Sequence, residues 1–231
     1  MISGLGENIL PSHVAFIMDG NRRWANKHSL ATELGHKEGY QRFKEIVDKA
    51  FELGVRTVTV YAFSTENWNR SDDEVSGIMN LARYVIKNDI GSYKKRKVKV
   101  NIIGETDMLP LDIQEQITSI ESETEKENNN VINIAFSYGS RAEIVRAACM
   151  AVDNNLEITE ESIGANLYTG GQTDPDLIIR TGGQPRLSNF LLWQAAYSEI
   201  YFTDSLWPDF DVKELMKSFE FYSKIKRNFG K

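Results

Sequence analysis

Short apolar runs alternate with longer amphipathic stretches along this chain, and no other feature restricts its fold as strongly. The short runs are rich in β-branched and aromatic residues, and several are apolar on both faces, as strands inside a parallel sheet are. The sequence predicts such strands at residues 14–18, 57–63, 98–103, 131–136, 177–179 and 200–203. Strand and helix patterns that alternate in this way indicate an α/β domain with a largely parallel sheet.

The stretches between the strands have helical spacing. Apolar residues from Tyr40 to Phe51 form one stripe, which Gly54 ends. Ser71 and Glu74 have the spacing of a capping box, which predicts the start of a second helix there. The sequence also predicts helices at 112–127, 140–153 and 211–228.

Composition narrows the class of protein. The 231 residues fit a single domain spanning 1–231, and a hydrophobic share of 41% is enough to build its core. A net charge of −6 argues against a nucleic-acid partner, because phosphate backbones attract basic surfaces. The single cysteine, Cys149, excludes an internal disulfide, and we expect it to be buried in a helix. Residues 1–12 lack a signal-peptide pattern and no apolar run approaches the ~20 residues of a membrane span, so we expect a cytoplasmic protein.

Three polar segments directly follow predicted strands. Ligands of parallel sheets bind beyond the carboxyl ends of the strands, so these segments are candidate binding loops. The first runs from Asp19 to Arg23 and joins a carboxylate, the turn residues Gly20 and Asn21, and two arginines. Those groups suit Mg²⁺ and phosphate, although an ordinary turn with solvated charges is the better reading of this segment taken alone.

The other two segments also carry polar groups that suit anions. Residues 64–70 combine a hydroxyl, a carboxylate, an amide, an indole and a guanidinium, and they also fit the N-terminal region of a helix. In the third segment Arg180 and Arg186 flank a Gly-Gly turn, with Ser188 beyond, which suits a diphosphate clamp or a solvated surface loop. Three candidate anion sites indicate two phosphorylated substrates. The sequence contains neither a GxxxxGK[ST] nor a GxGxxG motif, which argues against common nucleotide-binding enzymes.

The three histidines differ in how strongly the sequence suggests a functional role. We expect both His13, which precedes the first predicted strand, and His28, which lies in a polar stretch, at the surface. His36 begins a predicted helix beside Gly35, where it can face an anion. Spacing alone leaves a functional role for His36 open.

Taken together, these segments resemble the cis-prenyltransferases over residues 13–230, nearly the whole chain. The matching motifs lie at 18–25, 35–36, 61–70, 179–183, 186–194 and 198–202. The resemblance implies a six-stranded, mostly parallel sheet flanked by helices, and a homodimer. It also implies a Mg²⁺-dependent enzyme that condenses isopentenyl diphosphate onto an allylic diphosphate such as farnesyl diphosphate, to give a long polyprenyl diphosphate such as undecaprenyl diphosphate.

The resemblance assigns roles to individual residues. Asp19 and Asn67 would be catalytic, and Glu199 would complete the Mg²⁺ site with Asp19. Arg227 to Gly230 resembles an ending that can reach the partner subunit's site. The substrate-binding residues would be Gly20, Asn21, Arg22, Arg23, Trp24 and His36 at the allylic diphosphate, Arg180, Arg186, Leu187 and Ser188 at the isopentenyl diphosphate, and Ser64, Thr65, Glu66, Trp68 and Arg70 in the loop over the site.

Two positions depart from the bacterial pattern. Thr32 stands where an arginine is usual, and Asn130 stands where an apolar residue near the end of the product tunnel is usual. The tunnel itself could be lined by an apolar stripe, although plain core packing explains each residue equally well. The members of that stripe are Val75, Ile78, Met79, Ala82 and Val85, with Ala62 and Ile134.

Rival interpretations remain at this stage. A weakly catalytic partner subunit of a heteromeric prenyltransferase would lose the functional motifs, yet Asp19, Asn67 and Arg186 are present. An unrelated phosphate-binding enzyme, such as a phosphatase, would need a nucleophile that the segments do not offer. The proton acceptor of the reaction is open between Asn67, the substrate's own diphosphate and a water. A lipidic product also suggests peripheral contact with a membrane.

Overall fold

A six-stranded sheet forms the centre of the computed structural model, which describes residues 10–127 and 129–225. The strands lie in the order β3-β4-β2-β1-β5-β6, and every pairing between them is parallel. The prediction of a parallel α/β sheet is confirmed, and each strand begins and ends within two residues of its predicted bounds. The strands are β1 (His13–Ile17), β2 (Thr57–Ser64), β3 (Val98–Ile103), β4 (Asn130–Tyr138), β5 (Leu177–Arg180) and β6 (Glu199–Phe202).

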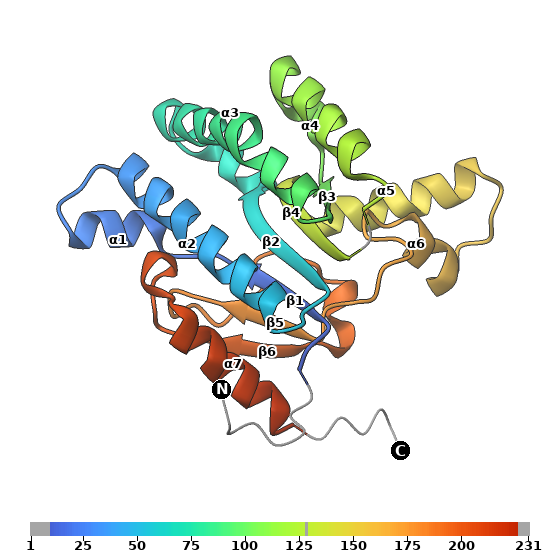
Figure 1. Cartoon of the computed structure of the whole chain (residues 1–231). Helices are drawn as coiled ribbons and strands as arrows, with labels where there is room; N and C mark the ends of the chain where they lie inside the picture. The colour runs from blue at the N-terminus through green and yellow to red at the C-terminus, as the bar shows by residue number, and fades with distance from the viewer. Residues whose placement is uncertain (1–9, 128, 226–231) are drawn as a thin grey trace.

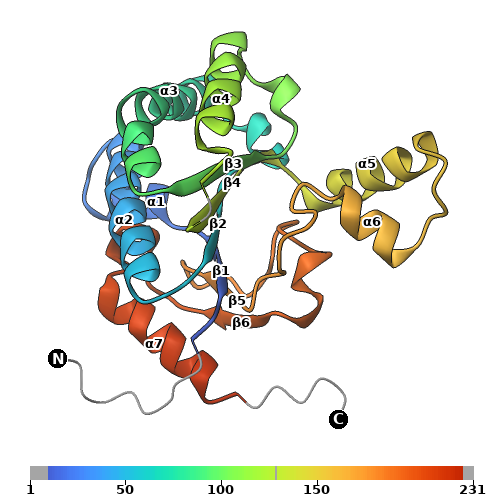
Figure 2. The same ribbon diagram turned by 45° about the vertical axis from the view of Figure 1, so that its right-hand side comes forward.

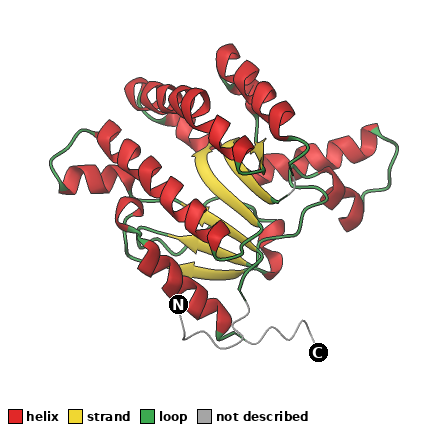
Figure 3. Ribbon diagram, viewed as in Figure 1, coloured by secondary structure: helices red, strands yellow, loops and turns green. Residues whose placement is uncertain are grey.

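Helices lie on both sides of the sheet (Figures 1 and 3). In Figure 2 the sheet is seen nearly edge-on, with α2 and α7 against one face and α5 and α6 projecting away on the other side. The helix predicted at 211–228 is α7, which ends at Ser223, earlier than predicted; residues 226–228 of the prediction lie outside the described residues. The helices are α1 (Asn21–Lys27), α2 (Thr32–Glu52), α3 (Asp72–Lys95), α4 (Leu111–Thr124), α5 (Ser140–Asp153), α6 (Glu160–Asn166) and α7 (Val212–Ser223), with short 3₁₀ turns η1 (Thr65–Asn69), η2 (Thr106–Met108), η3 (Gln194–Tyr197) and η4 (Trp207–Asp209).

The main core lies between one face of the sheet and helices α2 and α7. Alternate residues of each strand point to this face, among them Val14 and Phe16 of β1 and Val58 and Val60 of β2. They pack against the apolar stripe of α2 that the sequence predicts, and against three residues of α7. This packing covers the face of the sheet that lies opposite to α5 and α6.

The opposite face of the sheet carries a row of polar side chains, of which His13, Thr59 and Asn133 are buried. His13 Nε2 lies 2.7 Å from Thr59 Oγ1, and the Asn133 amide donates to Thr59 Oγ1 at 3.0 Å. Asn133 also donates to Gln172 Oε1 at 2.8 Å and accepts from the Asn101 amide at 2.8 Å. We call these five residues the polar row. Because strands of one sheet bring together residues far apart in the sequence, their polar groups satisfy one another away from water.

The polar row overturns the prediction of a surface position for His13, which is only 1% exposed. His13 lies at the start of β1, and its second ring nitrogen, Nδ1, lies 2.7 Å from the Thr173 carbonyl oxygen. Its partners are 46 and 160 positions away, so the sequence around His13 gives no sign of them. His28 is exposed, as expected.

Helix α5 corrects a second expectation. Cys149 lies in this helix, as predicted, but its side chain is exposed rather than buried. The reason is visible in Figure 2, where α5 and α6 project from the sheet, so that much of the surface of α5 faces outward. Over the described residues, no helix combines the length and the apolar character needed to cross a membrane.

Candidate active site

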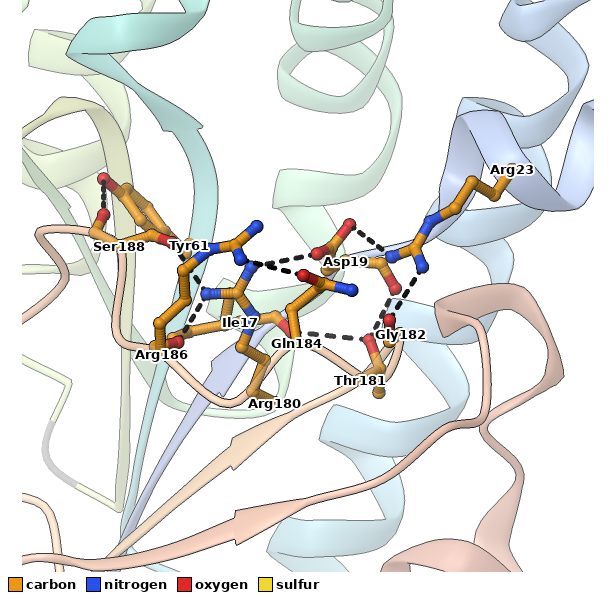
Figure 4. Close-up of polar contacts among 10 residues, drawn as sticks. All are labelled: Ile17, Asp19, Arg23, Tyr61, Arg180, Thr181, Gly182, Gln184, Arg186 and Ser188. Carbon is orange, nitrogen blue, oxygen red and sulfur yellow. Dashed lines mark hydrogen bonds and ion pairs between the residues drawn. The ribbon is translucent and has the colours of Figure 1, made fainter.

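The three polar segments meet at one edge of the sheet, as the sequence predicts. Strands β2, β1 and β5 are neighbours and run in the same direction, so their carboxyl ends lie side by side. Asp19 follows β1, η1 follows β2, and Thr181 follows β5. Figure 4 shows Asp19 between two arginines that come from opposite sides.

The carboxylate of Asp19 forms ion pairs with both of these arginines. Arg180 Nη2 lies 3.0 Å from Asp19 Oδ2, and Arg23 Nη2 lies 3.1 Å from Asp19 Oδ1 (Figure 4). The Arg180 side chain is 4% exposed, whereas that of Asp19 is 32% exposed. A buried guanidinium therefore holds a carboxylate that remains open to a ligand.

Arg180 also organises the loop that follows β5. Its Nη1 donates to Ser188 Oγ at 2.7 Å and to the carbonyl oxygen of Arg186, while its buried Nε has no hydrogen-bond partner. Arg186 is exposed, and its guanidinium donates to Gln184 Oε1 at 2.8 Å. Of the two predicted clamp arginines, Arg180 shapes the loop and Arg186 is open to solvent. Leu187 packs against the small apolar cluster around Phe190.

A glycine permits the close approach of Arg23 to this loop. Gly182 has a φ of +83°, and a Cβ at this position would lie 2.3 Å from Arg23 Nη2. The Gly182 carbonyl oxygen accepts from Arg23 Nη1 at 2.7 Å. The Gly-Gly turn that the sequence analysis identified is therefore needed for contact between the first and third segments.

A second cationic group surrounds Glu74, a residue that the sequence analysis did not place in the site. Arg70 Nη1 donates to Glu74 Oε1 at 2.7 Å, His36 Nε2 lies 3.6 Å from the same oxygen, and Arg22 Nη1 lies 3.7 Å from Oε2. Only one of the two hydrogen bonds of the predicted capping box is present. The Glu74 backbone N–H donates to Ser71 Oγ at 3.4 Å, but the Glu74 side chain binds these cations instead of the start of the helix.

The loop after β2 is tied down by its own polar groups. The Ser64 backbone N–H donates to Asn67 Oδ1 at 3.2 Å, and the Trp68 indole donates to Ser137 Oγ at 3.0 Å. Glu66 Oε1 accepts from the Asn189 amide at 3.0 Å, which joins this loop to the loop after β5. Thr65 also lies against the neighbouring Gly139, where a Cβ would come within 2.7 Å of Thr65 Oγ1.

Trp24 lies apart from the Asp19 group. Its indole N–H donates to Asp209 Oδ1 at 2.7 Å, and its ring lies 4.2 Å, centroid to centroid, from that of His28. The polar atom of Trp24 therefore anchors α1 to η4.

An apolar cavity of about 160 Å³ opens beside the Asp19 segment. Its lining is hydrocarbon except for two polar residues, Asn21 and His36. Asn21 Oδ1 and His36 Nε2 are both buried without a hydrogen-bond partner, and buried polar atoms of this kind normally bind water or a ligand. The apolar residues that line it are Met18, Tyr40, Phe43, Val60, Ala62, Ile78, Leu81, Ala82, Val85, Ile86, Ile102, Ile113, Ile117, Ile134, Phe136 and Trp207, together with Gly39.

The predicted tunnel stripe is largely found in this lining. Five of its seven residues line the cavity, but Val75 and Met79 do not. Both pack in an apolar cluster that also contains Ile78 and Ala82 of the lining. Asn130 also lies outside the lining, and its amide donates to the Val55 carbonyl oxygen at 2.9 Å. The direction in which α3 turns its side chains decides the places of Val75 and Met79, whereas Asn130 lies at the start of β4.

Asn21 has a fixed place at the mouth of the cavity. A Cβ at Gly39 of α2 would lie 2.2 Å from Asn21 Oδ1, and one at Gly35 would lie 2.3 Å from the Asn21 carbonyl oxygen. Both glycines therefore allow α1 to lie directly on α2. The sequence analysis noted Gly35 only as the neighbour of His36, and it did not identify Gly39.

The structure does not bring Glu199 to Asp19 within one chain. Glu199 is the first residue of β6 and pairs with Leu177, whereas Arg180, at the other end of β5, pairs with Ile17. Asp19 lies beyond that far end, so the two carboxylates are separated by roughly the length of a strand, about 3.3 Å per residue. The prediction that Glu199 and Asp19 share a Mg²⁺ site is therefore not met within one chain.

Of the two predicted metal ligands, Asp19 is thus the one that lies at this edge. Over the described residues, no group of three or more His, Cys, Asp or Glu side chains is arranged to hold a metal ion. Arg227 to Gly230, which the resemblance placed near a partner's site, lie outside the described residues.

Known proteins match this chain over nearly its whole length. A family model described as "Putative undecaprenyl diphosphate synthase" matches residues 17–230. An isoprenyl transferase of Fusobacterium nucleatum is 48% identical over 225 residues, which are 97% of each chain. One from Streptococcus pneumoniae is 45% identical over 96% of this chain and 92% of the relative.

Two solved structures have the same fold. Lavandulyl diphosphate synthase from Lavandula x intermedia, solved in complex with dimethylallyl diphosphate, superimposes with a TM-score of 0.91 at 33% identity, covering 96% of this chain and 99% of that one. A probable undecaprenyl diphosphate synthase from Campylobacter jejuni superimposes with a TM-score of 0.82 at 34% identity, covering 97% of this chain and all of that one. Sequence and fold agree, and the chain belongs to the prenyltransferase family whose model carries the description of undecaprenyl diphosphate synthase.

Proposed function

We propose that this protein is a Mg²⁺-dependent cis-prenyltransferase. It joins isopentenyl diphosphate units one after another to an allylic diphosphate, with farnesyl diphosphate as the expected starter and a long polyprenyl diphosphate, such as undecaprenyl diphosphate, as the product. The family membership supports the reaction class, and the site supports the substrate class.

One observation carries the proposal. The hydrocarbon-lined cavity has its two polar lining residues, Asn21 and His36, close in sequence and structure to the arginines of the Asp19 segment. An allylic diphosphate has the same division, because an anionic head is joined to an apolar chain. Arg22, Arg23 and His36 suit the head, and the cavity suits the chain.

The loop after β5 suits the second diphosphate. Arg186 is exposed with donors to offer, and Ser188 is oriented by Arg180. Arg180 itself gives both N–H groups of Nη1 and one of Nη2 to protein groups, so the second N–H of Nη2 and the unpartnered Nε–H remain for a ligand. Isopentenyl diphosphate would bind here, next to the allylic carbon.

Asp19 fits a magnesium site completed by substrate. Mg²⁺ commonly uses one or two carboxylates together with substrate phosphates, and Asp19 is a partly exposed carboxylate between groups that bind phosphate. When bound, the ion would neutralise charge on the leaving diphosphate. The arginines around Asp19 perform the same electrostatic task with fixed donors, and they cost no reorganisation during the reaction.

Asn67 is a weak candidate for the proton acceptor. A neutral amide is a poor base, and its Oδ1 already accepts from the Ser64 backbone N–H. The diphosphate of the substrate or a water is then the better acceptor. Asn67 contributes by holding the turn of η1 over the site.

We also propose a homodimer in the cytoplasm, with α5 and α6 in the interface. These helices project from the sheet, and they and the loop between them expose Val145, Val152, Leu156 and Ile158 (Figure 2). Glu199 can reach a metal at Asp19 only from a second copy of the chain. Light scattering after size-exclusion chromatography measures the mass, and a monomer at micromolar concentration would remove this part of the proposal.

The test of the activity is direct. The protein is incubated with farnesyl diphosphate and labelled isopentenyl diphosphate, with and without Mg²⁺, and the dephosphorylated products are separated by chromatography. We expect a Mg²⁺-dependent ladder of long products, and co-sedimentation with liposomes during synthesis would support peripheral membrane contact. If no allylic starter of 5 to about 20 carbons (one to four C₅ units) leads to incorporation, the catalytic role is wrong.

A further inference from the structure

Glu74 is a nearly buried carboxylate with no part in the reaction proposed above. Its side chain is 11% exposed, and it lies in the first turn of α3. Three cationic or ionisable side chains reach it from three different elements: Arg22 from α1, His36 from α2, and Arg70 from the residue that follows η1. No other carboxylate among the described residues contacts all three.

These three side chains need an anion among them. Like charges a few ångströms apart repel one another strongly at a partly buried site. Arg22 is 65% exposed, so without a partner it would turn into the solvent, where its long side chain has more freedom. Glu74 is itself held in place, because its backbone N–H donates to Ser71 Oγ.

The contacts of Glu74 leave the cations able to bind a ligand. Arg70 gives one N–H to Glu74, and a guanidinium has five. His36 Nε2 is buried without a hydrogen-bond partner and lines the cavity mouth. The side chains are thus held in one place while most of their donors stay open.

We propose that Glu74 is a positioning residue, which holds Arg22, Arg70 and His36 at the cavity mouth in the arrangement that receives the allylic diphosphate. This inference rests on the proposed function and deepens it, because it names the group that organises the cradle before substrate arrives. Glu74 acts through its three partners and does not touch the reacting atoms.

The ionisation of His36 reports on this arrangement. Burial lowers the pKa of His36, the Glu74 carboxylate raises it, and the neighbouring Arg70 and Arg22 lower it again. Replacing Glu74 by a neutral residue should therefore lower the His36 pKa further. The chain has only three histidines, so NMR can follow the His36 ring signals once they are assigned with a His36→Gln variant.

The experiment compares Glu74→Gln with a matched control, Glu33→Gln. Glu33 is an exposed carboxylate in the first turn of α2 that lies against α3, where its Cγ is 3.6 Å from a Cβ placed on Gly77. Both changes remove one negative charge from the same region. Only the first removes the contact with the three cations.

We expect Glu74→Gln to lower the His36 pKa and to weaken binding of inorganic pyrophosphate with Mg²⁺, measured by calorimetry, by about tenfold. The KM for the allylic diphosphate should rise by a similar factor, with a smaller change in kcat. Glu74→Asp, which keeps the charge on a shorter side chain, should restore the His36 pKa and part of the affinity. Glu33→Gln should change none of these values.

Tighter pyrophosphate binding or a lower KM in Glu74→Gln would overturn the inference, because it would show that Glu74 only competes with the ligand for the cations. Equal effects in both glutamine variants would overturn it as well. If Glu74→Gln does not fold, Glu74→Asp decides the matter by the same readouts. The His36 and pyrophosphate measurements need no turnover, so failure of the wild-type protein to incorporate label would refute the proposed function separately.

Discussion

Two groups of buried polar side chains, one on the sheet and one at its carboxyl edge, differ in whether their hydrogen-bond partners are complete. In the polar row, His13, Thr59 and Asn133 satisfy one another, and each ring nitrogen of His13 has a partner. At the carboxyl edge, Asn21 Oδ1, His36 Nε2 and Arg180 Nε are buried and unpartnered. A complete network stabilises the fold, whereas an incomplete one leaves binding capacity for a ligand.

The comparison predicts that substitutions at the carboxyl edge lower the activity, whereas substitutions in the polar row lower the free energy of unfolding. The largest effect is expected from Asp19→Asn, which keeps an acceptor for Arg180 but removes the charge. We expect kcat/KM to fall by roughly 10³-fold, as for loss of a principal electrostatic group. Thermal unfolding should shift little. A variant that loses its fold along with its activity would break the comparison.

Lowering the pH should destabilise the polar row through protonation of His13. Burial lowers the pKa of His13 to about 4, below the value of 6.5 for a free histidine. The folded protein therefore resists protonation there, and its stability is complete above pH 6.5 and falls as the pH drops from 6.5 towards 4. The loss from this one group is about 3 kcal/mol at most.

Denaturant unfolding at several pH values measures this effect. The wild-type protein is compared with His13→Gln, and the difference between the two removes the contributions of other acids and of His36. We expect that difference to depend on pH only between 4 and 6.5. A flat difference would mean that His13 titrates normally and that the row is open to water.

Gly39→Ala should disturb the edge and leave the row intact. The new Cβ would meet Asn21 Oδ1, so the Asn21 side chain has to move away from the cavity mouth. Because a displacement of about 1 Å can reduce catalysis strongly, we expect a loss of about tenfold in kcat/KM. Gly54→Ala has open space for its Cβ but a positive φ, so it serves as a control for backbone effects alone.

The smallest effect is expected at Cys149, which belongs to neither group. Its side chain is exposed on the same face of α5 as Val145 and Val152, which we place in the proposed dimer interface, so alkylation of the thiol should leave unfolding unchanged and lower activity only where it weakens the dimer. A loss of activity that disappears on concentrating the protein would support that interface, whereas a loss that persists at high concentration would contradict it. Mass spectrometry confirms the modification before both assays.

Much of the fold followed from the sequence, because strands buried on both faces need continuous apolar runs and such runs are visible locally. The meeting of Asp19, η1 and the loop after β5 followed from strand direction alone. His13 was misjudged because its partners lie up to 160 positions away, and Glu74 because two of its three partners lie on other helices. The position of Glu199 depended on the register of β6, which the sequence does not reveal.

Another part of the site was predicted from the sequence only in outline. The stripe on α3 was recognised, yet Val75 and Met79 turn away from the cavity while Leu81 and Ile86 line it. Apolar side chains on a helix look alike in sequence, and only the packing of α3 against the sheet separates those that line the cavity from those that fill a core. Resemblance to the family supplied the residue roles that the pattern could not.

The uniform direction of the six strands has an evolutionary consequence. All substrate-facing loops leave the sheet at one rim, so substitutions there can redirect the chemistry while the apolar body and the polar row remain under separate selection. The close superposition on lavandulyl diphosphate synthase, at only 33% identity, fits such a division. A chain built in this way can change its products through substitutions in these loops while its fold stays the same.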